Sequence, residues 1–218
     1  MTRSFAGSPL RRMARGQPTA GEAAPEERCD LCSEPLPGGH RHLVDLETGE
    51  ISCACQPCGV LFDHRAAGGG HYRLIRTRPR PLEDFRLDDL GWAALGIPVD
   101  LAFFVRGGES DRVTGYYPSP MGTMRSELEF GTWQQLVEDN PVLGGLEPDV
   151  EALLANRVGG AREYWLLPLD ECYRLVAVLR TRWQGFNGGD EVWEHVRRFF
   201  AELSPDAGRR AGTSGGEE

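Results

Sequence analysis

The sequence contains no lysine, so all 24 of its basic residues are arginine. No single site requires such a bias, and it indicates the composition of a GC-rich bacterial genome. The absence also bears on phosphate binding, because a P-loop needs a lysine after its glycines. The glycine-rich segment 185–189 has no such lysine, and the acidic Asp190 and Glu191 that follow it would repel an anion. We therefore interpret Asp190 as a helix N-cap and not as part of a phosphate site.

Long apolar runs are absent as well. The longest, IPVDLAFFV at 97–105, contains Asp100 and is much shorter than the roughly 18 residues that a membrane-spanning helix needs. The pair Arg11-Arg12 precedes a segment without an apolar core, which argues against a twin-arginine export signal. We expect a cytoplasmic protein without a membrane segment, whose reduced cysteines bind metal more readily than they form disulfides.

The sequence also has no excess of positive charge. The net charge of −9 and the pI of about 5.1 argue against a protein that binds nucleic acid through its overall charge. A local basic stripe lies beside the cysteine-rich segment and consists of Arg73, Arg76, Arg78 and Arg80. Such runs are usually solvated linkers, so a nucleic-acid-binding zinc ribbon is the second alternative function.

The composition divides the chain into four parts. Residues 1–27 form an arm rich in glycine, alanine and proline, and residues 207–218 form a polar tail; both are expected to be disordered. Residues 28–76 form a cysteine-rich module, and residues 77–206 form the main domain. Helical and strand patterns follow one another without a regular βαβ repeat. The predicted fold class is α+β, with a small four-cysteine zinc-ribbon-like β module followed by a mixed α+β domain.

The hydrophobic periodicity and the turn residues predict the individual elements. Strands are expected at 40–46, 51–53, 71–76, 98–106, 111–118, 126–130 and 162–168, and helices at 87–96, 131–140, 147–157, 169–183 and 188–203. Asp88 and Thr132 are the expected N-caps of two of these helices, and Pro148 stands near the start of a third. The two prolines in the linker 77–85 argue against regular strand pairing there.

Five of the six cysteines fall between residues 29 and 58, and four of them form two Cys-x2-Cys pairs. Cys29 and Cys32 precede the predicted hairpin, and Cys55 and Cys58 follow it. A zinc ribbon has this layout, because the hairpin brings two short cysteine loops to one metal ion. We expect Gly59 to adopt a positive φ after the second pair, whereas Ser33 gives the first pair a less typical loop.

Cys53 is then one thiol more than a tetrahedral site needs, and we interpret it as a buried apolar thiol at the end of a strand. His40, His42 and His64 are less favoured substitutes for one sulfur. Zinc is the preferred metal, with a single iron, as in rubredoxin, as the alternative. Because a module of this size buries little apolar surface, the metal is expected to be structural.

The remaining reactive residues specify no enzyme. Cys172 has no histidine near it in sequence, and we interpret it as a buried core thiol. Ser119 and Ser126 lie outside any GxSxG elbow. We therefore expect a non-catalytic protein.

Several motifs in combination carry a resemblance to a known family. They are CDLC and CACQPCG in the module, IPVDLAFFV, YYPSPMGTMRSEL and PDVEALL in the middle of the chain, and LPLDECYRLVAVLRTRWQGFNGG before EVW. Between residue 28 and about residue 203 the chain resembles an uncharacterised actinobacterial family of unknown function that is encoded beside [NiFe] hydrogenase genes. The resemblance implies a hydrogenase accessory protein whose partners are hydrogenase subunits or maturation factors, or, alternatively, a rubredoxin-like electron carrier for a hydrogenase.

Overall fold

The computed structural model describes residues 27–64, 66, 69–76, 78–119, 122–182 and 189–203. The predicted arm at 1–27, apart from its last residue Glu27, and the predicted tail at 207–218 lie outside these residues, as does the turn at 185–188. None of the described helices is long and apolar enough to cross a membrane.

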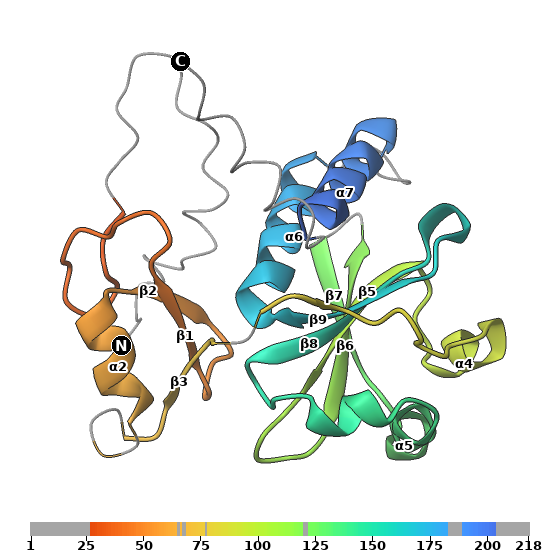
Figure 1. Ribbon diagram of the computed structural model, residues 1–218, viewed down its shortest axis with the longest axis horizontal. Helices are drawn as coiled ribbons and strands as arrows, with labels where there is room; N and C mark the ends of the chain where they lie inside the picture. The colour runs from red at the N-terminus through yellow and green to blue at the C-terminus, as the bar shows by residue number, and fades with distance from the viewer. Residues whose placement is uncertain are drawn as a thin grey trace, which may run out of the picture.

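The cysteine-rich module is built on a small antiparallel sheet (Figure 1). Strand β1 (Arg41–Asp45) pairs with β2 (Ile51–Ala54) on one side and with β3 (Tyr72–Leu74) on the other. All three strands fall where the sequence predicts them. Helix α2 (Gln56–Asp63) follows β2 after a single residue, and it includes the apolar stretch 59–63 that we had not assigned to a helix.

The larger sheet contains six strands within the described residues, in the order β4-β9-β8-β5-β6-β7, and every neighbouring pair is antiparallel. The bounds are β4 Arg80–Pro81, β5 Leu101–Arg106, β6 Val113–Ser119, β7 Gly122–Glu127, β8 Glu151–Asn156 and β9 Glu163–Pro168. The short strand β4 lies in the proline-containing linker, where no pairing was expected. Pro81 is tolerated because β4 is an edge strand with a partner on one side only.

Helices cover both faces of this sheet (Figure 1). On β5, Leu101 and Phe103 face the helices α6 (Leu169–Arg182) and α7 (Gly189–Leu203). Ala102 and Phe104, which alternate with them, face the opposite core that includes α4 (Asp89–Ala94) and α5 (Phe130–Asp139). Short 3-10 helices at Pro141–Gly145 and Val158–Gly160 complete the connections.

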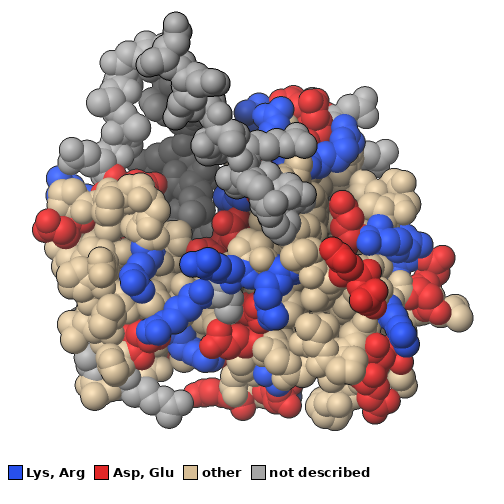
Figure 2. All heavy atoms as spheres, in the orientation of Figure 1, with Lys and Arg blue, Asp and Glu red and all other residues tan. Residues whose placement is uncertain are grey.

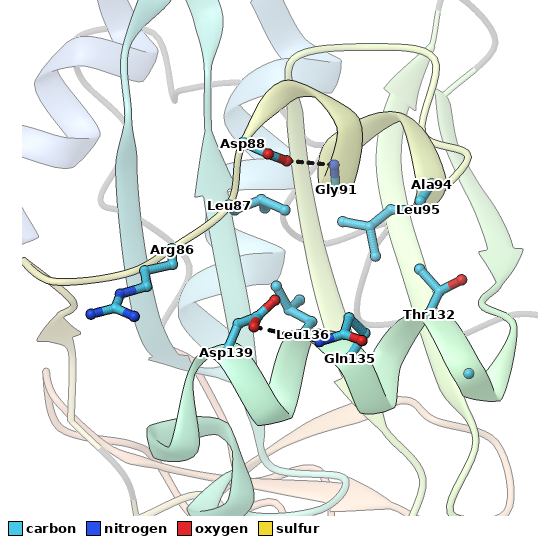
Figure 3. A pocket seen from close by; sticks show the side chains of 11 residues that line it. Arg86, Leu87, Asp88, Gly91, Ala94, Leu95, Thr132, Gln135, Leu136 and Asp139 are labelled. Carbon is cyan, nitrogen blue, oxygen red and sulfur yellow. Dashed lines mark hydrogen bonds between the residues drawn. The ribbon is translucent and has the colours of Figure 1, made fainter.

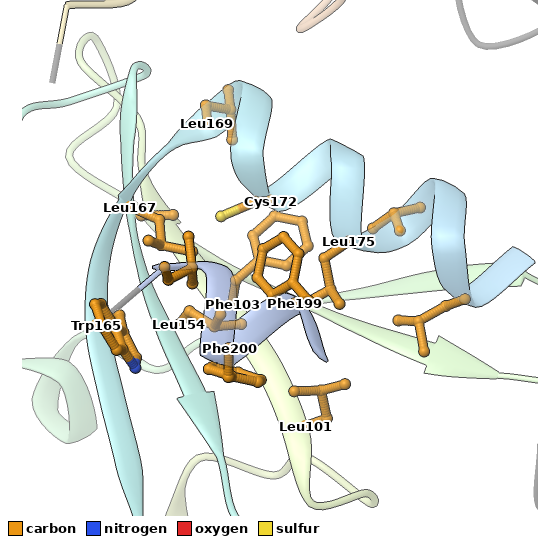
Figure 4. Close-up of a cluster of buried hydrophobic side chains, with 14 of the residues drawn as sticks. Leu101, Phe103, Leu154, Trp165, Leu167, Leu169, Cys172, Leu175, Phe199 and Phe200 are labelled. Atoms are coloured by element: carbon orange, nitrogen blue, oxygen red, sulfur yellow. The ribbon is translucent and has the colours of Figure 1, made fainter. Parts of the chain in front are cut away.

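One apolar face of the last helix packs into the core beneath α6 and α7 (Figure 4). Its α7 members are Val192, Val196, Phe199, Phe200 and Leu203, and all of them are buried. α7 begins at Gly189, so Asp190 belongs to its first turn and is not the N-cap that we expected. Cys172 of α6 is fully buried in the same core, as predicted for a structural thiol.

Three other predictions of local structure are wrong. Segment 147–157 forms strand β8 and not a helix, because β8 is a central strand buried on both faces and its apolar run hides the two-residue alternation. The strand predicted at 126–130 is β7, which ends at Glu127. Helix α5 begins at Phe130 after Glu129, so Thr132 lies inside the helix.

The module packs on the larger domain. Val44 of β1 belongs to the same buried cluster as Leu169 and Cys172 at the start of α6. The α+β class of the prediction is confirmed, with the four predicted cysteines gathered in the small module.

Candidate metal centre

Four thiols meet at one end of the module. The sulfur atoms of Cys29, Cys32, Cys55 and Cys58 all lie within 4.8 Å of one another. Cys29, Cys55 and Cys58 are buried and Cys32 is exposed, so the cluster lies just below the surface. The structure therefore brings together the four residues that the spacing of the two pairs predicts.

A tight turn positions the first pair. The backbone N–H of Ser33 donates to the carbonyl of Cys29 at 2.8 Å, and the N–H of Cys29 donates to the carbonyl of Glu34 at the same distance. Ser33 has a φ of 64°, so the residue that stands in place of a glycine adopts the left-handed conformation itself. The loop is anchored to β2 by Asp30, which accepts a 2.8 Å hydrogen bond from the N–H of Cys53.

A helix start positions the second pair. Cys55 is the N-cap of α2, Pro57 lies in the first turn, and Cys58 is one turn beyond Cys55. Gly59 has helical backbone and no positive φ, contrary to our prediction. A glycine is favoured here for a different reason. A Cβ atom at this position would lie 2.9 Å from Cδ of the Arg41 side chain, which packs over the helix.

The spacing of the sulfurs fits a tetrahedral ion. The Sγ atoms of Cys32 and Cys55 are 3.6 Å apart, and a tetrahedron with Zn–S bonds of about 2.3 Å has edges of about 3.8 Å. A disulfide requires about 2.05 Å, and none of the six cysteines, all of which are described, is disulfide bonded. A four-sulfur set suits zinc or iron and leaves no open coordination position.

Two of the four crowded thiols have pKa values shifted in opposite directions. Burial raises the pKa of the Cys29 thiol, but hydrogen bonds with the backbone of Cys55 and Cys32 outweigh it and lower this pKa to about 6. Burial, and then contact with the Cys32 thiol, raises the pKa of Cys58. The Cys29 thiol therefore ionises readily, whereas the Cys58 thiol next to it ionises with difficulty. A bound cation removes that conflict, because it stabilises all four thiolates together.

A family comparison covers most of the chain. The sequence profile of DUF5947, a family of unknown function, matches residues 28–207. The chain belongs to the DUF5947 family. The match begins one residue before Cys29 and continues beyond α7, so the family spans both the four-thiol module and the larger domain. The searches of curated proteins and of solved structures found no match.

The fifth cysteine of this DUF5947 protein lies outside the four-thiol cluster. Cys53 is half-buried and groups with His40 and His42, so the interpretation of it as a buried apolar thiol is wrong. The Nδ1–H group of His42 donates a hydrogen bond to Oδ2 of Asp170 on α6 at 2.8 Å. The Asp170 carboxylate, and then the Cys53 thiol, raise the pKa of His42 to about 10.

The histidines proposed as substitute ligands therefore lie elsewhere. His40 and His42 form a second cluster with Cys53, and His64 ends α2 as its C-cap. Sequence reasoning missed the second cluster because it weighed each of these residues separately. The available signal was the hairpin itself, which pairs the His-x-His strand with the strand that carries Cys53.

The basic stripe is largely neutralised in the DUF5947 structure. Arg73 pairs with Asp149 at 3.6 Å, Arg76 with Asp63 at 2.5 Å, and Arg80 with the buried Glu151 at 3.3 Å. Figure 2 shows acidic side chains interspersed among the basic ones on this face. These pairs leave little net positive charge for a nucleic acid backbone.

The larger domain carries a surface cavity of about 770 Å³ between α4 and α5 (Figure 3). Leu87, Leu95 and Leu136 provide its apolar surface, and Gln135 and Asp139 lie along α5. Asp88, on the opposite side, accepts a hydrogen bond from the N–H of Gly91 and caps α4, as the sequence predicts. The polar and charged residues that line the cavity are Arg86, Asp88, Thr132, Gln135 and Asp139.

Proposed function

We propose that this DUF5947 protein is a non-catalytic, zinc-stabilised accessory protein of the cytoplasm that binds a protein partner. One observation carries the metal part of the proposal, namely the convergence of four cysteine sulfurs within 4.8 Å. Zinc fits this donor set, because four thiolates at tetrahedral spacing are typical of closed structural sites.

The small core of the module supports a structural role for the ion. Its buried cluster contains six residues, Cys29, Leu43, Ala54, Cys55, Cys58 and Leu74, and three of these are thiols of the proposed site. Without the ion, the first cysteine loop and α2 are held against the hairpin by Leu43, Ala54 and Leu74 and by the partly buried Leu31, Leu36, Phe62 and Tyr72. In structural zinc sites the metal supplies folding free energy directly.

The surface around α4 and α5 supports the proposed contact with a protein. Leu90 on α4 and Phe130 on α5 are 82% and 65% exposed, and each is followed in the chain by a glycine that lines the cavity. The cavity lined by these two helices provides a recess next to them. We propose that a hydrogenase subunit or maturation factor places apolar side chains here. The hydrogenase context rests on the sequence resemblance alone.

Elemental analysis of the purified full-length protein tests the metal. We expect zinc in the wild type and loss of the four-thiol ion in Cys55→Ser, whereas Cys172→Ala, a buried thiol on α6, keeps it. A red protein with visible charge-transfer bands and one iron per chain would replace the zinc proposal by the electron-carrier alternative. Retention of all bound metal in Cys55→Ser would refute the ligand set.

Co-purification with the subunits and maturation factors of a [NiFe] hydrogenase from the same organism tests the partner. We expect the wild type to bind one of them and the double variant Leu90→Ser, Phe130→Ser to lose that binding. Met124→Ser, at an exposed apolar residue of β7, is the matched control and should bind normally. Failure of the wild type to bind any of these proteins would contradict the hydrogenase assignment.

A further inference from the structure

A second group of metal-binding side chains lies in the module, apart from the four-thiol cluster. His40, His42 and Cys53 each direct one donor atom to a common point, and these atoms lie within 4.8 Å of one another. His42 of β1 is paired in register with Cys53 of β2, so their side chains project on the same face of the hairpin. His40 precedes β1 by one residue and lies two positions from His42, on the same side of an extended chain.

The burial of His40 is unexplained by the protein alone. Its side chain is only 10% exposed, and neither of its ring nitrogens has a hydrogen-bond partner within the described part of the chain. Its ring meets that of His42 edge-on, with centroids 4.8 Å apart. Burying an imidazole with unsatisfied nitrogens is unfavourable, and coordination to a metal ion offsets that cost.

Asp170 orients the second imidazole for the same purpose. Its Oδ2 atom lies 2.8 Å from Nδ1 of His42, while Oδ1 accepts a hydrogen bond from the N–H of Glu171 at 2.9 Å. With Nδ1 engaged, the ligand atom of His42 is Nε2. Glu27 has a carboxylate oxygen 3.5 Å from Nδ1 of His40. A carboxylate hydrogen bonded behind an imidazole is the usual arrangement around histidines that bind metal, and Asp170 takes that place behind His42.

We propose that His40, His42 and Cys53 form a second metal site, which takes a divalent transition-metal ion such as Zn²⁺. Two imidazole nitrogens and one thiolate suit zinc, and three protein ligands leave the fourth tetrahedral position to water or another exchangeable ligand. The four-thiol site is closed, whereas this one is open. It also lies against α6, so it joins the module to the larger domain through Asp170.

A thiol nucleophile is the competing interpretation. In space, His42 lies between Cys53 and Asp170, as the histidine does in a cysteine protease triad. In such a triad the histidine activates the thiol and the carboxylate orients the histidine. That arrangement assigns no role to His40 and leaves its buried nitrogens unsatisfied. Metal binding accounts for all four residues, and it is therefore the proposal that the contacts favour.

Zinc stoichiometry of the full-length protein under reducing conditions tests the proposal. We expect two zinc ions per chain in the wild type and one in both Cys53→Ser and His40→Ala. His71→Ala is the matched control, because His71 is an exposed histidine of the same module that pairs with Glu47, and it should keep two. A single ion in the wild type, or two in both His40→Ala and Cys53→Ser, would overturn the second site.

The second site rests on the module fold of the proposed function. Two further readouts show which of the two proposals fails. Cys55→Ser removes the closed site, so a wild type with one ion that Cys55→Ser loses would refute the second site alone. If Cys53→Ser loses both ions, His40→Ala decides, since it leaves the cysteines and their loops unchanged. Loss of a single ion in His40→Ala supports the proposal, and loss of both or of neither refutes it.

Alkylation of the native protein by iodoacetamide addresses the thiol itself. We expect the second equivalent of Zn²⁺ to slow modification of Cys53 at least tenfold, with the buried Cys172 unreactive throughout as the internal standard. Rapid modification of Cys53 at the same rate with and without that second equivalent would contradict metal binding and favour a nucleophilic thiol.

Discussion

The Nδ1 atom of His42 lies 2.8 Å from Oδ2 of Asp170, although 128 residues separate them in the sequence. The contact joins strand β1 of the small module to the first turn of α6 in the larger domain. Val44, two residues after His42, packs into the core beneath α6. A polar and an apolar contact thus fix the module on the same helix.

Asp170→Asn should weaken metal binding at the second site. The amide keeps the size of the side chain and can still accept the hydrogen bond from the N–H of Glu171, but it loses the charge that supports His42. Loss of such a carboxylate typically costs 10–100-fold in metal affinity. Zinc affinity measured by competition with a chromogenic chelator should fall in that range for one of the two ions and stay unchanged for the other. An unchanged affinity for both ions would separate Asp170 from metal binding.

Removal of both ions by a strong chelator should unfold the module and leave the larger sheet intact. Structural zinc contributes about 10–16 kcal/mol in small zinc domains, and three of the six buried residues of the module core are thiols of the proposed site. Hydrogen exchange should show loss of protection in β1, β2 and β3 together. Amides of the central strands β5 and β8 should keep their protection in the same sample, and their simultaneous loss would show that the two parts fold as one unit.

Phe104→Ala should destabilise the larger domain by about 3–5 kcal/mol, because it empties a fully buried site. The Phe104 ring contacts Trp92 of α4 and Trp133 of α5, so the cavity would open between the sheet and both helices. Urea unfolding measures the change. Leu90→Ala removes an equally apolar but exposed side chain and should change the free energy of unfolding by less than about 0.5 kcal/mol.

Asp88→Ala should cost about 1 kcal/mol, because it removes the carboxylate that accepts the N–H of Gly91 at 2.7 Å. Asp88→Asn keeps an acceptor in the same place and should recover most of that loss. The same urea experiment compares the two variants. Equal destabilisation by alanine and asparagine would mean that the negative charge, and not the cap hydrogen bond, stabilises α4.

The sequence was sufficient for elements whose pattern agrees with their surroundings. Helix α7 keeps one apolar face against the sheet, and its residues show the helical spacing directly. The prediction for β8 failed because β8 is a central strand. Both of its faces are buried, so the adjacent Leu153 and Leu154 are both apolar, as they would be on one face of a helix. The prediction that the linker forms no strand failed because β4 is an edge strand, and an edge strand tolerates Pro81. In a central strand this proline would be excluded.

The four-thiol site was predictable because its ligands come in two short pairs whose spacing alone limits the geometry. The second group was not predicted, because its members are single residues brought together by strand register. His42 and Cys53 become neighbours only once the hairpin is paired in the register that is observed. Asp170 comes from a helix whose position depends on the packing of the whole larger domain.

Zinc X-ray absorption spectroscopy of Cys53→Ser loaded with one equivalent of zinc tests the central claim most directly. This variant lacks the thiol of the second site, so the spectrum reports the proposed closed site alone. We predict a first shell of four sulfur atoms at about 2.3 Å from the zinc. A first shell that contains nitrogen or oxygen atoms would contradict the assignment of Cys29, Cys32, Cys55 and Cys58 as the complete ligand set.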